Sequence, residues 1–163
     1  PFDFYKDKPT PKSMIGQSQK TTYTHLDGEA VGRHQGAHFF TIGQRKGLAV
    51  GGTPEPLFVI DTDVDENIVY VGQGKEHPGL HRKALKVVSD EIHWVRNDLK
   101  IPLGVKLEVK ARIRYRQPLQ KATLIKQKEA LYVVFEQPQS AITSGQFVAW
   151  YQNEELVGSG VIS

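Results

Sequence analysis

The sequence predicts a mainly β protein, and three observations lead to this fold class. Short apolar segments recur about every 8 to 12 residues between turn-forming residues, a pattern typical of small antiparallel barrels. Residues 105–116 alternate apolar and charged side chains, which is the period of a strand with one face in a core. No long amphipathic helix is evident, and the one helical candidate, 37–45, is followed by Gly47 as a C-terminal cap.

The first part of the chain is expected to form a linker and a small mixed domain. Residues 1–21 are polar, contain three prolines and show no periodicity, so we expect a linker or a loosely ordered arm. The small central domain is expected over 22–84, with a short extended piece at 29–32. The apolar segments 56–61 and 67–72 flank a polar Thr-Asp-Val-Asp-Glu turn, which predicts a hairpin.

The remaining residues, 85–163, are expected to form an antiparallel β-barrel. The first strand is predicted at 85–94, and a connection at 97–104 leads into the alternating strand. Two hairpins are predicted after it. One joins 122–126 to 131–136 around Gln-Lys-Glu-Ala, and the other joins 146–151 to 155–162 around Gln-Asn-Glu.

The alternating strand carries most of its charge with one sign. Its charged positions are five cations and the single carboxylate of Glu108, and 106–128 contain eight Lys or Arg in a chain of formal net charge +3. Such a stripe suits a polyanion, because each neutralised phosphate releases counterions. The alternative is a solvated sheet face on which Lys and Arg prevent edge pairing.

Several kinds of catalytic chemistry are disfavoured in this chain. The absence of cysteine excludes disulfides, thiolate metal sites and cysteine nucleophiles. His34/His38 and His77/His81 have metal-ligand spacing, but glycine or proline interrupts each pair and zinc usually needs three or four protein ligands. The glycine-rich segment 32–48 lacks both the Walker and the dinucleotide-binding spacing. We therefore expect no catalytic residue, metal or cofactor here.

Two residues near the basic stripe have both a structural and a functional interpretation. Gln146 could simply be the first residue of its strand, and the spacing in the sequence favours this interpretation. The alternative is that it lies near Arg114 and binds a ribose or phosphate. Tyr115 faces the core if alternation is strict. If the strand ends or bulges before Pro118, its ring emerges beside Arg114 and can stack on a base.

The sequence also resembles a known family. Gly-x-His-x-Gly at 32–36 and Phe-Thr-Ile-Gly-Gln-Arg-Lys-Gly-Leu at 40–48 are similar to the signature after the catalytic domain of bacterial tRNA-specific 2-thiouridylases. The resemblance covers about residues 27–163. It continues through Arg-Tyr-Arg-Gln at 114–117, Ala-Ile-Thr at 141–143, Gly-Gln at 145–146 and Gly-x-Gly-x-Ile at 158–162.

The resemblance implies a three-domain enzyme. An N-terminal domain would use ATP with magnesium to adenylate the wobble uridine in tRNAs for Lys, Glu and Gln. A cysteine persulfide, charged by a sulfur-relay donor protein, would then give 2-thiouridine. This chain lacks the Ser-Gly-Gly-Val-Asp-Ser loop and both cysteines of the family. It therefore resembles the C-terminal part, a central domain and a barrel like those of translation factors, and is expected to be inactive alone.

The predicted role is tRNA docking. The resemblance places tRNA-contacting positions at Arg114, Tyr115 and Gln146, and charge adds Arg112, Arg116, Arg45 and Lys46, the last two in a turn-rich segment. The alternative is a protein-interaction barrel of the translation-factor type. We expect a monomer in the cytoplasm, a location that the absence of cysteine fits. We expect no membrane partner, because no apolar run approaches the roughly 18 residues of a membrane helix.

Overall fold

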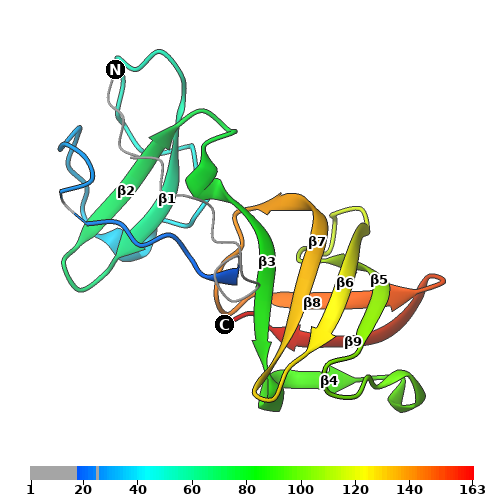
Figure 1. The fold of residues 1–163 in the computed structure, drawn as a ribbon. Coiled ribbons are helices and arrows are strands. Elements are labelled where there is room, and N and C mark those ends of the chain that lie inside the picture. Colours follow the sequence, from blue (N-terminus) through cyan, green and yellow to red (C-terminus); the bar gives the residue numbers. More distant parts are fainter. Residues whose placement is uncertain (1–17, 25) are drawn as a thin grey trace. The chain divides into compact units, whose positions relative to one another are not determined.

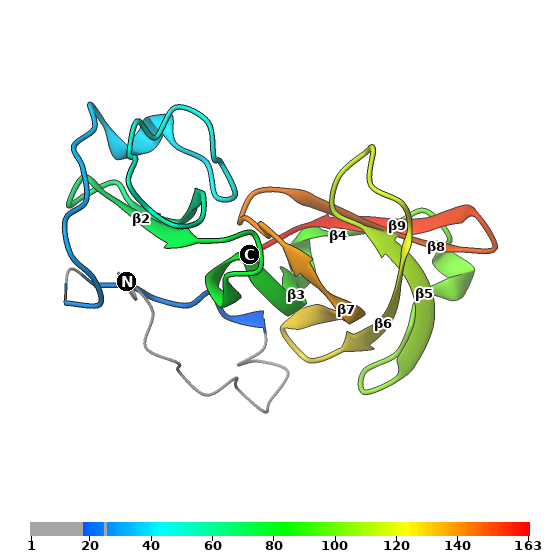
Figure 2. The same ribbon diagram turned by 90° about the horizontal axis from the view of Figure 1, so that it is seen from above.

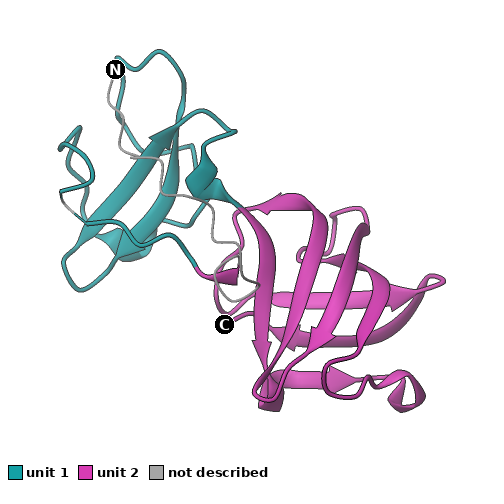
Figure 3. Ribbon diagram, in the orientation of Figure 1, with its two compact units in different colours: residues 1–9, 20–81 teal, residues 10–19, 82–163 magenta. Residues whose placement is uncertain are grey.

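The computed structural model describes residues 18–163 apart from residue 25, so the predicted arm at 1–21 lies mostly outside the described residues. These residues form two compact units (Figures 1 and 3). One unit is Lys20–His81, and the other is Arg82–Ser163 together with residues 18 and 19. No helix in the described part of the chain is long and apolar enough to cross a membrane.

The first unit contains one antiparallel hairpin, as the sequence predicts. Its strands are β1 (Leu57–Asp63) and β2 (Ile68–Gln73), with a bulge between Val59 and Asp61. Asn67 closes the turn with a positive φ of 55°, a conformation that asparagine tolerates better than most residues. Buried apolar side chains on the two faces of the hairpin provide two small cores.

The predicted helix at 37–45 is wrong. Only Ala37–Phe39 form a single 3₁₀ turn, η1, and the following residues form turns. The backbone of this segment bonds to β1 instead of to itself. The Gly43 N–H donates to the Val59 carbonyl (2.7 Å), and the Val59 N–H donates to the Gln44 carbonyl (2.9 Å). Tertiary backbone pairing therefore replaces the helical bonds in this segment.

The second unit is a curled seven-stranded sheet with strand order β3-β7-β6-β5-β8-β9-β4. From β7 to β4 in this order, neighbouring strands pair antiparallel. The strands are β3 (His81–Val88), β4 (Ile92–Trp94), β5 (Lys106–Arg112), β6 (Gln120–Lys126), β7 (Ala130–Ser140), β8 (Phe147–Gln152) and β9 (Glu155–Val161).

The sheet curls until distant strands meet, as the view from above shows (Figure 2). The N–H of Ser163, just after β9, donates to the carbonyl of Lys86 in β3 at 2.9 Å. This bond joins two strands that are not neighbours in the sheet order. The mainly β fold class with an antiparallel, barrel-like second half is thus confirmed.

The single strand predicted at 85–94 is two strands. β3 ends at Val88, the 3₁₀ turn η3 (Ser89–Glu91) redirects the chain, and β4 pairs with β9. The Ser89 N–H donates to the Glu129 carbonyl at 3.0 Å, which fixes the corner through a residue distant in sequence. A local apolar pattern carries no signal for such a bond.

The main core lies inside the curled sheet. Trp150 and Phe135 are its largest fully buried side chains. Trp94 packs edge-on against Trp150, with ring centroids 5.6 Å apart. Gly158 permits this packing, because a Cβ there would lie 2.8 Å from the Trp150 ring. The side chains on the outer face of the sheet are not part of this core and can contact other molecules.

Candidate nucleic-acid interface

The basic stripe lies on the outer face of β5. The alternation that the sequence predicts is confirmed along this strand, because one set of side chains packs in the core while the other is exposed. Leu107, Val109 and Ala111 point inward, and Lys106, Glu108 and Lys110 point outward. The core thereby fixes which side chains reach solvent.

The strand ends at Arg112, although the alternating pattern continues to Arg116. Residues 113–117 form a turn in which the Gln117 N–H donates to the Arg114 carbonyl at 3.1 Å. The Ile113 N–H donates to Oε1 of Gln117, also at 3.1 Å. The predicted strand over 105–116 is therefore too long. The predicted condition for exposing both Arg114 and Tyr115, an end before Pro118, is confirmed.

Tyr115 is the most exposed large hydrophobic residue of the described chain, at 85% of its possible surface. Arg114 and Arg116 on either side are also exposed. A tyrosine ring between two guanidinium groups combines a stacking surface with positive charge, the combination that single-stranded RNA recognition uses. The turn therefore offers both kinds of contact within three residues.

Arg112 makes contacts to two different elements. Its Nη1 donates to the Tyr115 carbonyl (3.0 Å), and its Nη2 donates to the Tyr151 hydroxyl in β8 (2.9 Å). The guanidinium carbon lies 5.4 Å from the ring centroid of Tyr115 and 5.2 Å from that of Tyr151, within cation–π range of both. The side chain thus links the turn to the neighbouring strand.

Arg114 and Gln146 are anchored to the same connection between β7 and β8. Nη2 of Arg114 donates to the carbonyls of Ser140 (3.0 Å) and Ala141 (2.9 Å). The half-buried Gln146 accepts the Thr143 N–H at its Oε1 (3.3 Å). The structure therefore brings these two predicted residues to one short segment. The side-chain NH₂ of Gln146 donates to no other described residue, so it can donate to a ligand.

The positive charge of the turn has no acidic partner in the described part of the chain. The ion pairs of this part involve none of Arg112, Arg114 and Arg116. Arg116 forms no hydrogen bond with another described residue. An uncompensated cation keeps its attraction for an external anion, so the charge of this turn is available to a phosphate.

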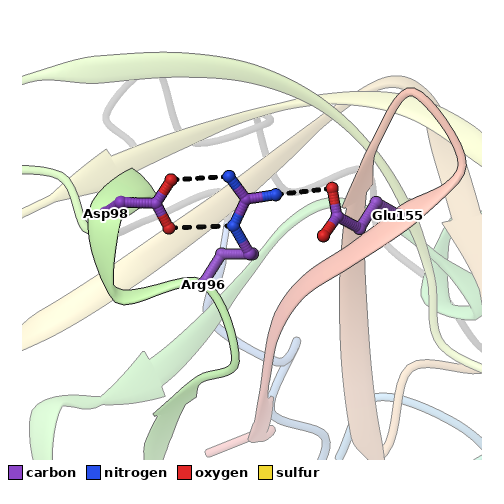
Figure 4. A network of polar contacts seen from close by, with 3 residues as sticks. All are labelled: Arg96, Asp98 and Glu155. Carbon is purple, nitrogen blue, oxygen red and sulfur yellow. Dashed lines mark hydrogen bonds and ion pairs between the residues drawn. The ribbon is translucent and has the colours of Figure 1, made fainter.

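Arg96 on the same barrel is the contrasting case (Figure 4). It donates two bonds to the carboxylate of Asp98, at 2.8 and 2.6 Å, and one to Glu155 at 2.5 Å. These bonds raise the pKa of Arg96 above its ordinary value and lower the pKa of Asp98 below its own. The charge of Arg96 is therefore neutralised within the protein.

Arg45 and Lys46 belong to the first unit and form a group of their own. Both are exposed in the turns that follow η1. The side-chain amide of Gln44 donates to the Lys46 carbonyl at 2.9 Å, which holds this turn. The two cations remain predicted tRNA contacts.

One exposed residue of the outer face was missed by the sequence argument. Phe147, the first residue of β8, is 66% exposed next to Gln146. It shares the outward side of β8 with Tyr151, because Val148 and Trp150 between them are buried. The alternation around the obvious core tryptophan was a sufficient signal for finding Phe147.

Neither histidine pair belongs to a group of three His, Asp or Glu side chains close enough to hold a metal ion within the described residues. The first member of each pair instead closes a local turn. Nδ1 of His34 accepts the Gly36 N–H, and Nδ1 of His77 accepts the Gly79 N–H, each at 3.1 Å. Any residue except proline could donate these bonds, so the glycines follow from lack of space: a Cβ at Gly36 would lie 2.7 Å from the His38 ring, and one at Gly79 would lie 3.1 Å from Nδ1 of His77.

Comparison with known proteins gives matches along nearly the whole chain. Residues 12–73 match the family model of the tRNA methyl transferase PRC-barrel domain, and 84–162 match that of the aminomethyltransferase β-barrel domain. The chain is 65% identical over 156 residues to the tRNA-specific 2-thiouridylase of Christiangramia forsetii, covering 93% of this chain and 40% of that protein.

Further relatives give the same picture. The tRNA-specific 2-thiouridylase of Flavobacterium johnsoniae is 63% identical over 147 residues, covering 90% of this chain and 37% of that protein. The one of Halalkalibacterium halodurans is 44% identical over 138 residues, covering 84% and 36%. The chain thus spans well under half the length of the curated relatives it matches.

Proposed function

Since the chain belongs to the family of tRNA-specific 2-thiouridylases, we propose that it is the tRNA-docking part of such an enzyme. The observation that carries this proposal is the exposed turn at 113–117. It presents Arg114, Tyr115 and Arg116 to solvent, and no described carboxylate neutralises them. A site of this composition suits the phosphates and bases of an RNA.

Five of the predicted residues have distinct parts in docking. Arg116 and the exposed lysines of β5 neutralise phosphates, which supplies affinity without reading sequence. The ring of Tyr115 stacks on an unpaired base or a ribose. The amide NH₂ of Gln146 donates to a ribose or phosphate oxygen, while its amide oxygen holds the Thr143 backbone. Arg45 and Lys46 add phosphate contacts from the first unit.

In the whole enzyme, this chain would bind and orient tRNA while another domain performs the chemistry. That domain would use ATP with magnesium to activate the wobble uridine of tRNAs for Lys, Glu and Gln. A sulfur-relay protein would provide the persulfide sulfur. We place the enzyme in the cytoplasm as a monomer. The chain itself has no cysteine to carry sulfur, so we propose that it is inactive alone.

The competing function is a protein-interaction barrel. Such a barrel calls for a contiguous exposed apolar patch, because apolar burial drives most protein association. The face around β5 instead has lysines and arginines on it, with aromatic rings between them. This composition supports RNA over a protein as the partner.

The test is tRNA binding by the whole 163-residue chain at several salt concentrations. Arg114→Ala and Arg116→Ala are compared with Arg96→Ala, a matched arginine on the same barrel that is already paired with two carboxylates. We expect Arg116→Ala to weaken binding and to reduce the slope of log affinity against log salt by about 0.7 to 0.9, one phosphate contact. If all three variants bind like the parent, the docking function is wrong.

A further inference from the structure

We propose that Arg112 is a positioning residue, which holds the exposed turn in its binding conformation and does not itself contact the RNA. This inference rests on the proposed function and refines the site at 113–117. It also replaces the expectation that Arg112 binds tRNA directly. The charge pattern alone treats all three arginines as equivalent, whereas their contacts differ.

The first step is the location of Arg112. It is the last residue of β5 and pairs with Ala149 in β8. Its backbone is therefore held in the sheet, whereas the residues that follow it turn away from the sheet. The side chain points along the outer face, toward both the turn and the neighbouring strand. It is half-buried, in contrast to the exposed Arg114 and Arg116.

The second step is what occupies its donors. One Nη bonds to the Tyr115 carbonyl and the other to the Tyr151 hydroxyl, at 3.0 and 2.9 Å. Both aromatic rings lie within cation–π range of the guanidinium. A phosphate would have to displace these partners, while Arg116 offers its donors without such competition.

The third step is the consequence for Tyr115. The residue is exposed, so few packing contacts restrain it, and the bond from Arg112 ties its backbone to β5 and β8. A side chain that is ordered before binding does not lose that freedom on binding. Arg112 therefore raises affinity by preorganising the ring that stacks on the RNA.

Arginine and lysine differ in this role. The planar guanidinium donates in two directions at once, whereas a lysine ammonium is a point charge on a flexible stem. Arg112→Lys keeps the charge and loses the link between the Tyr115 carbonyl and the Tyr151 hydroxyl. Tyr151→Phe keeps both rings and removes only the hydroxyl that accepts one of the two bonds.

The experiment measures tRNA affinity and its salt slope for Arg112→Ala, Arg112→Lys and Tyr151→Phe, with Arg116→Ala as the phosphate reference. We expect Arg112→Lys to bind about 3- to 10-fold more weakly, close to Arg112→Ala, with the parent slope. If Arg112→Lys binds like the parent while Arg112→Ala loses about 0.7 to 0.9 in slope, Arg112 is a phosphate ligand and the inference is overturned.

A second measurement needs no RNA and separates this inference from the proposed function. Amide hydrogen exchange at 113–117 is compared in the parent, Arg112→Lys and Tyr151→Phe. Faster exchange in both variants supports the positioning role even if the parent chain binds no tRNA. Unchanged exchange overturns it even if tRNA binds. Tyr151→Phe keeps the test decisive if Arg112→Ala does not fold.

Discussion

Lys110 in β5 and Lys121 in β6 lie directly opposite each other on the outer face of the barrel. Like charges in this position destabilise a strand pair. Lys121 has a distant carboxylate partner, Glu136 at 3.9 Å, while Lys110 forms no ion pair with a described residue. On its other side, Lys110 pairs with Tyr151. The sheet therefore holds the positive charges of Lys110 and Lys121 close together, and a bound polyanion would reduce the repulsion between them.

Lys110→Gln is expected to stabilise the chain and weaken its binding to tRNA. Removing the repulsion should raise the free energy of unfolding by about 0.2 to 1 kcal/mol at low salt, with a smaller gain at high salt. Urea unfolding at two salt concentrations measures this change. The control is Lys106→Gln, whose partner in β6 is the uncharged Ile125. A loss of stability at low salt in Lys110→Gln would contradict the repulsion argument.

Tyr115→Ala is expected to weaken tRNA binding without affecting stability. Its ring is 85% exposed, so the free energy of unfolding should change by less than about 0.5 kcal/mol. Losing one stacked base should cost about 1 to 3 kcal/mol of binding free energy, with the salt slope unchanged. Tyr115→Phe keeps the ring and serves as the control in the same titration. Equal weakening by both substitutions would argue against stacking.

Phe147→Ala is expected to weaken tRNA binding as well, because the ring lies beside Gln146 on the outward side of β8. The matched control is Leu103→Ala, since Leu103 is 65% exposed but lies outside this face of β8. Fluorescence anisotropy with labelled tRNA compares the two variants. If the Phe147 and Leu103 variants bind tRNA with the same affinity, Phe147 is not part of the interface.

The parts of the fold that follow from local pattern were predictable, and those set by distant contacts were not. The hairpin of β1 and β2 and the alternation of β5 follow from residue periodicity. The segment at 37–45 is fixed by two backbone bonds with Val59, one donated by Gly43 and one accepted by Gln44, and the corner at Ser89 is fixed by a bond to Glu129. No local pattern carries information about these distant partners.

The site shows the same division. The exposed positions of Arg114 and Tyr115 depend on the strand ending at Arg112. The turn that follows is held by bonds from Arg114 to carbonyls at 140–141 and from Arg112 to the Tyr115 carbonyl. The residue types and the resemblance predict which side chains contact tRNA. Only the geometry separates these two anchored arginines from Arg116, which has no such bond among the described residues.

Asp98→Asn is expected to destabilise the chain near neutral pH and to have no effect in strong acid. The bond from Arg96 holds the pKa of Asp98 below its ordinary value of 3.8, so the folded state favours the ionised carboxyl. A carboxyl with a lowered folded pKa stabilises the protein above its unfolded pKa. That stabilisation is lost as pH falls through the folded pKa.

Thermal unfolding of the parent and Asp98→Asn across this pH range tests the prediction. The parent should have the higher midpoint near pH 7, and the two curves should converge as the pH drops below the lowered pKa of Asp98. The affinity for tRNA should be equal in both chains near neutral pH, because Arg96 and its partners are not among the proposed contacts. A gap between the midpoints that persists in strong acid would show that the substitution acts through packing and not through the charge of the carboxyl.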